Sequence, residues 1–158
     1  MDQVLHEAGE LGVDRLITIS VDGPSLSKIK RLLSKWPRIY GTAGLHPHSA
    51  TEFGKESAES IRNAVQQETR ILAVGEIGLD YHYNFSEPID QRRIFQDQLE
   101  MANCLKFPAV VHCREADNDI LACLSKSGNT SGVIHCFSSN LAFANSILKI
   151  GFHKSFTG

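Results

Sequence analysis

Three apolar runs of the sequence carry side chains that bind metal ions in proteins. Glu76, His112 and His135 each lie in, or at the end of, a short apolar run of the kind that forms a buried strand. A carboxylate or an imidazole in such a run is costly unless it is paired or bound to a cation. One carboxylate and two imidazoles suit Zn, Mn, Fe or Ni, whereas Mg prefers more oxygen ligands. We therefore predict that these three side chains meet at one metal site.

The predicted site has the composition of a catalytic metal centre. Its three ligands come from separate strands, so it is not a local finger. Three protein ligands leave a coordination position for water, and a metal ion there lowers the pKa of that water toward neutrality. The alternative is structural: each His would be hydrogen-bonded in the core and Glu76 would be salt-bridged. Three such residues at equivalent strand ends favour the metal site.

Two charged side chains directly follow the proposed ligands. Asp80 ends the run that contains Glu76, where a carboxylate either orients a metal ligand or holds the following loop. Arg114 comes two residues after His112. A guanidinium at this place would grip a phosphate through two hydrogen bonds, and its alternative partners are the acidic residues at 115 and 117.

His46 belongs to a His-Pro-His sequence that follows another predicted strand. The spacing of its two histidines is also found in metal sites. Pro47 and the loop position instead favour a substrate-facing or orienting role for His46, and His46 is better placed for this role than His48.

The segments that must position these residues alternate between helix and strand. Helices are predicted at residues 1–11, 25–36, 55–68, 86–106, 115–126 and 140–150, and strands at 15–21, 39–45, 71–79, 107–113, 131–137 and 152–156. Such alternation implies a parallel sheet with right-handed crossovers. The polar residues follow several different strands, which favours a (β/α)8 TIM barrel over a doubly wound sheet, whose site lies at one switch point.

The length allows only part of such a barrel. The chain has 158 residues, whereas a closed barrel has eight strands and typically ~250 residues. We expect one partial α/β barrel domain over residues 1–158 with about six of the eight strands. One strand would precede Met1, and one or more units would follow Gly158.

Composition limits the class of protein. The formal net charge of −2 neither recruits nor excludes nucleic acid, so phosphate binding must be local. The four cysteines form no C-x-x-C pair, which indicates reduced thiols in a cytoplasmic protein. We find no signal peptide and no apolar stretch long enough to span a bilayer, and therefore expect no membrane association.

Five motifs extend this pattern along nearly the whole sequence. They are Gly44-Leu-His-Pro47, Ala73-Val-Gly-Glu-Ile-Gly-Leu-Asp-Tyr81, Gln91-Arg-Arg-Ile-Phe-Gln-Asp-Gln-Leu99, Pro108-Ala-Val-Val-His-Cys-Arg-Glu-Ala116 and Gly132-Val-Ile-His-Cys-Phe-Ser138. Together, and in this order, they resemble the TatD family of metal-dependent hydrolases. The resemblance implies a (β/α)8 barrel of the amidohydrolase type and divalent-metal hydrolysis of phosphodiesters, as a deoxyribonuclease or 3′-5′ exonuclease with DNA as substrate.

The resemblance also implies roles for individual residues. It maps metal ligands onto Glu76, His112 and His135, with Glu76 bridging two ions if two are present. The cofactor is then a divalent cation, Mg, Mn or Zn, as one or two ions. Glu76, His46 and Arg114 form the expected catalytic set, and His46, Asp80 and Arg114 the expected substrate-binding set. The sequence lacks the family's first-strand H-x-H pair and its late aspartate, so one metal ion is expected.

Two alternatives to a nuclease remain at this stage. A barrel fragment with open sheet edges would bind metal without turnover and be stable only as an assembly formed through those edges. An intact metal site would equally serve hydrolysis of an amide or an ester. A substrate panel with a chelator control, and the oligomeric mass, separate these alternatives.

Overall fold

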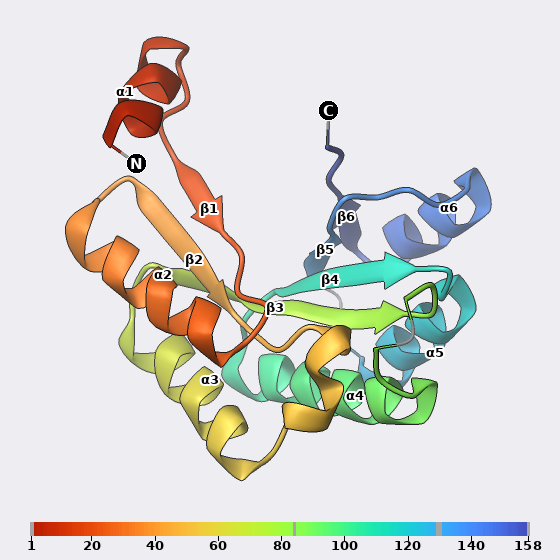
Figure 1. Ribbon diagram of the computed structural model, residues 1–158. Helices are drawn as coiled ribbons and strands as arrows, with labels where there is room; N and C mark the ends of the chain where they lie inside the picture. The colour runs from red at the N-terminus through yellow and green to blue at the C-terminus, as the bar shows by residue number, and fades with distance from the viewer. Residues whose placement is uncertain (1, 84, 129–130, 158) are drawn as a thin grey trace.

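Six parallel strands form one sheet in which each strand pairs with the next strand of the chain (Figure 1). The computed structural model describes residues 2–83, 85–128 and 131–157. The strands are β1 (Leu16–Thr18), β2 (Ile39–Ala43), β3 (Ile71–Asp80), β4 (Ala109–Arg114), β5 (Gly132–Ile134) and β6 (Phe152–Lys154). The predicted alternation of helix and parallel strand is therefore confirmed.

Helices cover the outer side of this sheet. They are α1 (Asp2–Glu10), α2 (Gly23–Lys35), α3 (Lys55–Gln67), α4 (Pro88–Leu105), α5 (Asp117–Ser127) and α6 (Leu141–Lys149), and a 3₁₀ helix, η1, spans Pro47–Glu52. Met1, the first residue of the first predicted helix, lies outside the described residues. No helix in the described ranges is both long and apolar enough to cross a membrane.

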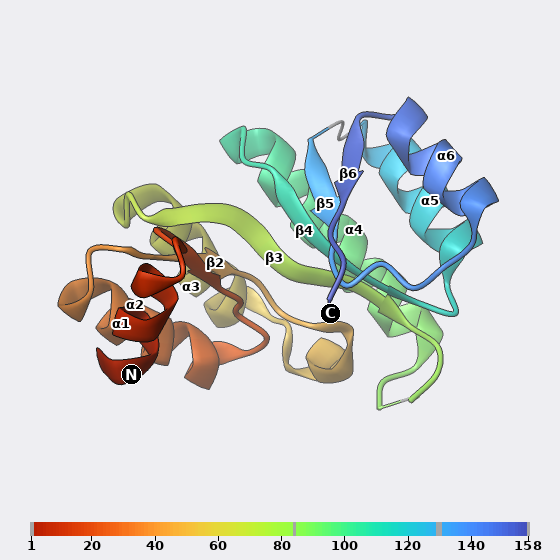
Figure 2. The ribbon, with the colours of Figure 1, turned by 90° about the horizontal axis from the view of Figure 1, so that it is seen from above.

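The sheet curls into part of a barrel. In Figure 1, β1 and β2 lie on one side of the curled sheet and β5 and β6 on the other. β3 and β4 form its middle, with α4 below them. Figure 2 shows the same sheet from above, with β3 running through the middle of the molecule. The prediction of an incomplete (β/α)8 barrel is confirmed, whereas self-association through the edges at β1 and β6 stays a prediction.

The centre of the fold is β3 on α4. β3 is buried on nearly every residue, because it has neighbouring strands on both sides and helices beneath it. α4 begins with Pro88 in its first turn, where no backbone N–H is needed, and ends at Lys106 in the left-handed conformation. The inner face of α4 contributes Phe95 and Leu99 to the hydrophobic core, both with no exposed surface. Packing against this face sets the position of β3 relative to the helix.

Four predicted strands end early: the runs 39–45 and 152–156 end two residues early, at Ala43 and Lys154, and two others end three residues early. The run 15–21 forms a strand only over Leu16–Thr18, and the run 131–137 only over Gly132–Ile134. After the second of these the chain turns, with Cys136 at a φ of 49°. The 3₁₀ helix η1 was not predicted, because a helix of six residues leaves no apolar period in the sequence.

Gly78 permits the close approach of β3 and β4. It pairs with His112 and has a φ of 136°, and a Cβ atom at this position would lie 2.1 Å from the carbonyl oxygen of His112. Both the steric conflict and the backbone conformation exclude any side chain here.

We expect Gly78→Ala to destabilise the protein by at least about 2 kcal/mol, because β3 and β4 must separate. Urea denaturation measures the effect. Gly23→Ala is the matched control, since a Cβ atom at Gly23 meets no atom within 4 Å and should change the free energy of unfolding by less than about 0.5 kcal/mol. Equal stability of the two variants would contradict the argument.

Candidate metal site

Glu76 lies at an irregularity in β3. Gly75 pairs with Val110 and Ile77 with Val111 of β4, so Glu76 is an extra residue between two successive partners. A bulge of this kind redirects a side chain. The peptide bond between Gly75 and Glu76 is cis. The Glu76 side chain is directed at β4, and Glu76 is only 8 % exposed.

Three side chains form a compact group: His46 just after β2, Glu76 at the bulge of β3 and His112 in β4. His46, Glu76 and His112 each offer a ligand atom, and these atoms all lie within 4.8 Å of one another. Nδ1 of His112 is 3.2 Å from Oε1 of Glu76, and the His46 and His112 rings are 4.5 Å apart. Two imidazoles and a carboxylate fit a divalent transition metal.

His135, the third predicted ligand, lies outside this group. Its Nδ1 is 3.2 Å from the hydroxyl of Ser155, which follows β6. His135 lies near enough to be one of the histidines whose charge lowers the pKa of Glu76. The structure thus brings Glu76 and His112 together and leaves the ligand role of His135 as a prediction.

Asp80 connects two histidines. The residue is 1 % exposed, and its Oδ2 lies 2.9 Å from Nε2 of His112 and 2.9 Å from Nε2 of His48. Oδ1 accepts the backbone N–H groups of His82 and Tyr83. Burial alone would raise the pKa of Asp80, but these hydrogen bonds outweigh it and lower the pKa to about 2. Asp80 therefore both orients ring nitrogens and holds the loop after β3, the two roles considered for it from the sequence.

The bond to Asp80 selects the nitrogen of His112 that can bind a metal. An ionised carboxylate only accepts hydrogen bonds, so Nε2 of His112 carries a proton. Nδ1 faces the Glu76 carboxylate at 3.2 Å, so a bound metal ion would take the place of the proton that Nδ1 shares with Glu76 in the metal-free protein. Burial would lower the pKa of His112, but the hydrogen bonds to Glu76 and Asp80 outweigh it and raise the pKa. Likewise, burial would raise the pKa of Glu76, and the bond to His112 and nearby histidine charges lower it.

His46 has a different character from His112. Burial and the charge of His112 lower the pKa of His46 to about 4, so its ring is neutral near pH 7. Its Nδ1 accepts the backbone N–H of His48 at 3.2 Å, which caps η1. With Nδ1 occupied as an acceptor, the neutral ring carries its proton on Nε2 and is a hydrogen-bond donor. This state suits a contact with a substrate oxygen.

Two buried glutamines of α4 hold the strand ends that carry the site. Gln98 donates to the carbonyl of Leu45 (3.0 Å) and accepts the N–H of Leu45 (2.8 Å). Gln91 does the same to Asp80, at 2.9 and 2.8 Å. Neither glutamine has exposed surface. They lie seven residues apart, on one face of α4, and each fixes the backbone at or beside a functional side chain.

Sequence reasoning assigned no role to these glutamines or to His48. The signal was present: two polar residues, seven positions apart, lie among the apolar residues that form the inner face of a long helix. Buried amides of this kind need partners, and the free backbone groups past a strand end are the nearest ones.

Arg114 has no ion pair within the described part of the chain. The two acidic residues that the sequence offered as its partners bond other groups. Glu115 lies 2.8 Å from Nδ1 of His82, and Asp117 accepts hydrogen bonds from Cys113 and Ser139. The Arg114 guanidinium carbon lies 5.3 Å from the centre of the Tyr83 ring. Its charge is therefore free to meet an anion at the rim.

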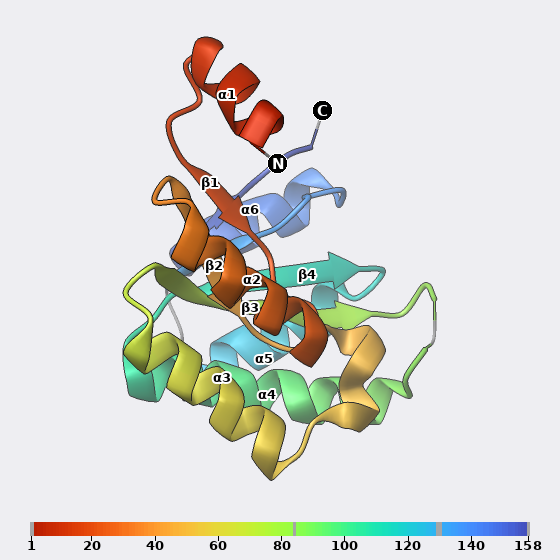
Figure 3. The ribbon, with the colours of Figure 1, turned by 60° about the vertical axis from the view of Figure 1, so that its left-hand side comes forward.

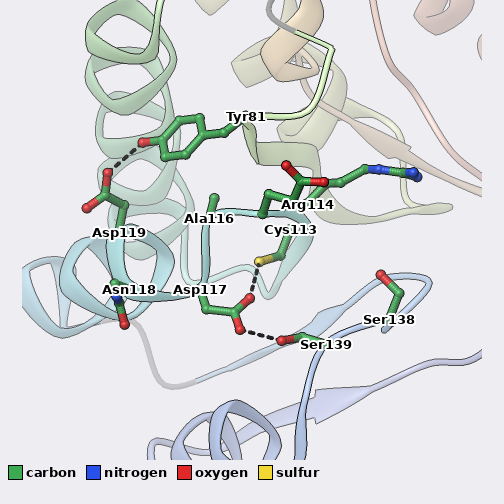
Figure 4. A pocket seen from close by; sticks show the side chains of 10 residues that line it. Tyr81, Cys113, Arg114, Ala116, Asp117, Asn118, Asp119, Ser138 and Ser139 are labelled. Carbon is green, nitrogen blue, oxygen red and sulfur yellow. Dashed lines mark hydrogen bonds between the residues drawn. The ribbon is translucent and has the colours of Figure 1, made fainter.

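A cavity of about 750 Å³ opens beside the metal site, between β4 and the beginning of α5 (Figure 4). Asp117 and Asp119 give it an acidic lining, and Asp119 accepts from the hydroxyl of Tyr81 at 2.6 Å. Burial and Asp117 raise the pKa of Cys113 to about 12. In Figure 4 the Arg114 side chain runs away from these carboxylates.

Comparison with known proteins identifies related sequences. The family model described as "TatD related DNase" matches residues 1–158. The chain is 28% identical over 160 residues to the uncharacterized metal-dependent hydrolase YabD of Bacillus subtilis, covering 100% of this chain and 62% of that protein. It is 34% identical over 162 residues to the 3′-5′ ssDNA/RNA exonuclease TatD of Cronobacter turicensis, covering 99% of this chain and 60% of that protein.

Solved structures share the fold. YJJV, a TatD homolog from Escherichia coli K12, superposes with a TM-score of 0.90 at 24% identity, covering 97% of this chain and 60% of the other. A TatD family hydrolase from Entamoeba histolytica gives a TM-score of 0.90 at 24% identity, covering 98% and 55%. The chain spans about 60% of the length of the curated relatives described above.

Gln98→Leu should destabilise the protein by about 2–4 kcal/mol, because the N–H and C=O of Leu45 lose their partners in a buried place. Chemical denaturation measures this change. Gln96→Leu, on an outer position of the same helix where the side chain reaches only Glu100, serves as the control and should shift stability by less than about 0.5 kcal/mol. A small effect of Gln98→Leu would show that water or another group replaces the amide.

Asp80 should stabilise the metal-free protein in a pH-dependent way. Its pKa is about 2 in the folded protein against about 3.9 in an unfolded chain, so its contribution is present above about pH 4 and is lost as the pH falls toward 2. We expect Asp80→Asn to lower the free energy of unfolding by about 2–3 kcal/mol at pH 7 and to remove most of this pH dependence. Urea denaturation of the two proteins between pH 2 and 7, with a chelator present, measures their free energies of unfolding. If these free energies depend on pH in the same way, Asp80 does not stabilise the protein as described.

Proposed function

Because the chain belongs to the TatD family of related DNases, we propose that it takes part in metal-dependent hydrolysis of phosphodiester bonds in DNA. The observation that carries this proposal is the grouping of His46, Glu76 and His112 within 4.8 Å at the strand ends of the partial barrel. The exonuclease names of several relatives support a single-stranded DNA or RNA substrate.

Glu76 and His112 would hold the metal ion, through a carboxylate oxygen and Nδ1. His135, at the same rim, is the proposed third ligand. When bound, a divalent metal ion supplies a water molecule acidic enough to act as a nucleophile near neutral pH. The mixed nitrogen and oxygen set favours Zn or Mn over Mg.

The remaining rim residues would act on the substrate. Neutral His46 would donate its Nε2–H to a phosphate or leaving-group oxygen. Arg114, which has no ion pair in the described ranges, would bind the phosphate by charge-assisted hydrogen bonds. Asp80 would keep Nε2 of His112 protonated, so that Nδ1 stays directed at Glu76.

Removing the carboxylate of Glu76 and removing the ring of His46 should have different effects. Glu76→Ala should weaken Mn²⁺ or Zn²⁺ binding at least about 100-fold and abolish chelator-sensitive hydrolysis of single-stranded DNA. His46→Ala should change metal affinity less than about 10-fold and still lower hydrolysis about 100-fold or more. Calorimetry measures metal binding, and a 3′-labelled oligonucleotide measures cleavage.

Each part of the proposal has its own contradicting result. Loss of metal binding in His46→Ala would make His46 a ligand. Retained metal binding in Glu76→Ala would remove Glu76 from the site. Metal binding without cleavage of DNA or RNA, together with turnover of an ester or amide, would assign the site to another hydrolase class; no turnover on the whole panel would assign it to binding alone.

A further inference from the structure

Two aromatic rings stand exposed on the loop after β3, and we call them the aromatic pair: Tyr83 and Phe85. They are 51% and 66% exposed, and their rings lie within 15° of parallel with centres 5.9 Å apart. Neither belongs to the hydrophobic core. Two large rings that lie side by side and remain at least half exposed indicate a surface that meets a ligand.

The aromatic pair lies directly beside the proposed metal site. The ring of His48 is 4.8 Å from that of Phe85 and 5.7 Å from that of Tyr83. His48 bonds Asp80, which in turn bonds His112. Asp80 also accepts the N–H of Tyr83, so one buried carboxylate positions both a proposed metal ligand and the aromatic surface.

Arg114 places a positive charge on the aromatic pair. The guanidinium of Arg114 lies over Tyr83, 5.3 Å from its ring centre, and has no carboxylate partner in the described ranges. Arg114 also lines the cavity that contains Asp117 and Asp119, but Asp119 pairs with Arg92 at 3.1 Å and the Arg114 side chain runs away from both carboxylates (Figure 4). A phosphate chain entering the rim is thus directed over Arg114 and the aromatic pair.

We propose that the aromatic pair is a base-stacking platform for single-stranded nucleic acid. This inference rests on the proposed function and adds to it the means by which the strand is recognised. A base of an unpaired strand stacks on the exposed faces of Tyr83 and Phe85 while Arg114 contacts the neighbouring phosphate, which brings a phosphodiester to the group of His46, Glu76 and His112. Every base has a flat π face, so the platform tolerates any sequence. Bases within a duplex are already stacked and are excluded.

Binding of oligonucleotides with and without bases tests the platform. The probes are a phosphorothioate oligothymidylate about ten nucleotides long, which resists cleavage, and an abasic strand of the same length and charge. Fluorescence anisotropy with Mn²⁺ present measures their affinities. Stacking predicts that the wild-type protein binds the thymidylate about 5- to 100-fold more tightly than the abasic strand.

Variants then locate that preference. The double variant Tyr83→Ala, Phe85→Ala should lose the preference for bases and bind both strands alike, whereas Tyr83→Phe, Phe85→Trp keeps two rings and should keep it. Leu11→Ala is the control: Leu11 is 85% exposed and follows α1, which lies away from the carboxyl ends of β3 and β4 (Figure 3). Circular dichroism confirms that each variant is folded.

The outcomes separate this inference from the proposed function. A base preference that disappears with the two rings supports the platform, whether or not the protein cleaves DNA. Equal wild-type affinity for both strands, or a preference that survives in the alanine variant, overturns the platform. Cleavage that persists beside either of these results leaves the proposed hydrolysis standing.

Discussion

The buried carboxylate of Asp80 is the interaction on which the rim depends. A carboxylate with 1 % exposure stays ionised only because four donors surround it: two imidazole nitrogens and two backbone N–H groups. Each of these bonds also constrains its donor. The ring of His112 is turned so that Nδ1 meets Glu76, and the loop at His82 and Tyr83 is held against the strand end.

The glutamines of α4 solve a related problem for the backbone. A parallel strand that ends at a functional rim leaves N–H and C=O groups without a ladder partner. Gln91 and Gln98 each bond the backbone of one such strand end through the side-chain amide. The helix beneath the sheet thus supplies hydrogen bonds that a neighbouring strand would otherwise make. Because both amides sit on one rigid helix, the positions of Leu45 and Asp80 are fixed relative to each other.

The fold and part of the candidate site could be predicted from the sequence, for reasons that particular residues show. Regular alternation of helical and β-branched runs predicted the partial barrel. The acid in the run at Glu76 and the imidazole ending the run at His112 stood out because apolar strands exclude them. The two glutamines of α4 stand out among apolar residues, but which backbone each one bonds, such as Leu45 for Gln98, depends on tertiary distance. The bulge at Glu76 is likewise set by how β3 meets β4.

The difference between His112 and His135 follows from the ladders that hold them. β3 and β4 are central strands, and their ladder runs on both sides of the bulge at Glu76, from Val74 with Ala109 to Asp80 with Arg114. β5 pairs with β4 over only three residues and ends at Ile134. His135 lies just beyond, where its ring is held through Ser155. The bulge between these paired segments therefore brings Glu76 to His112, whereas the place of His135 depends on the loops after β5 and β6.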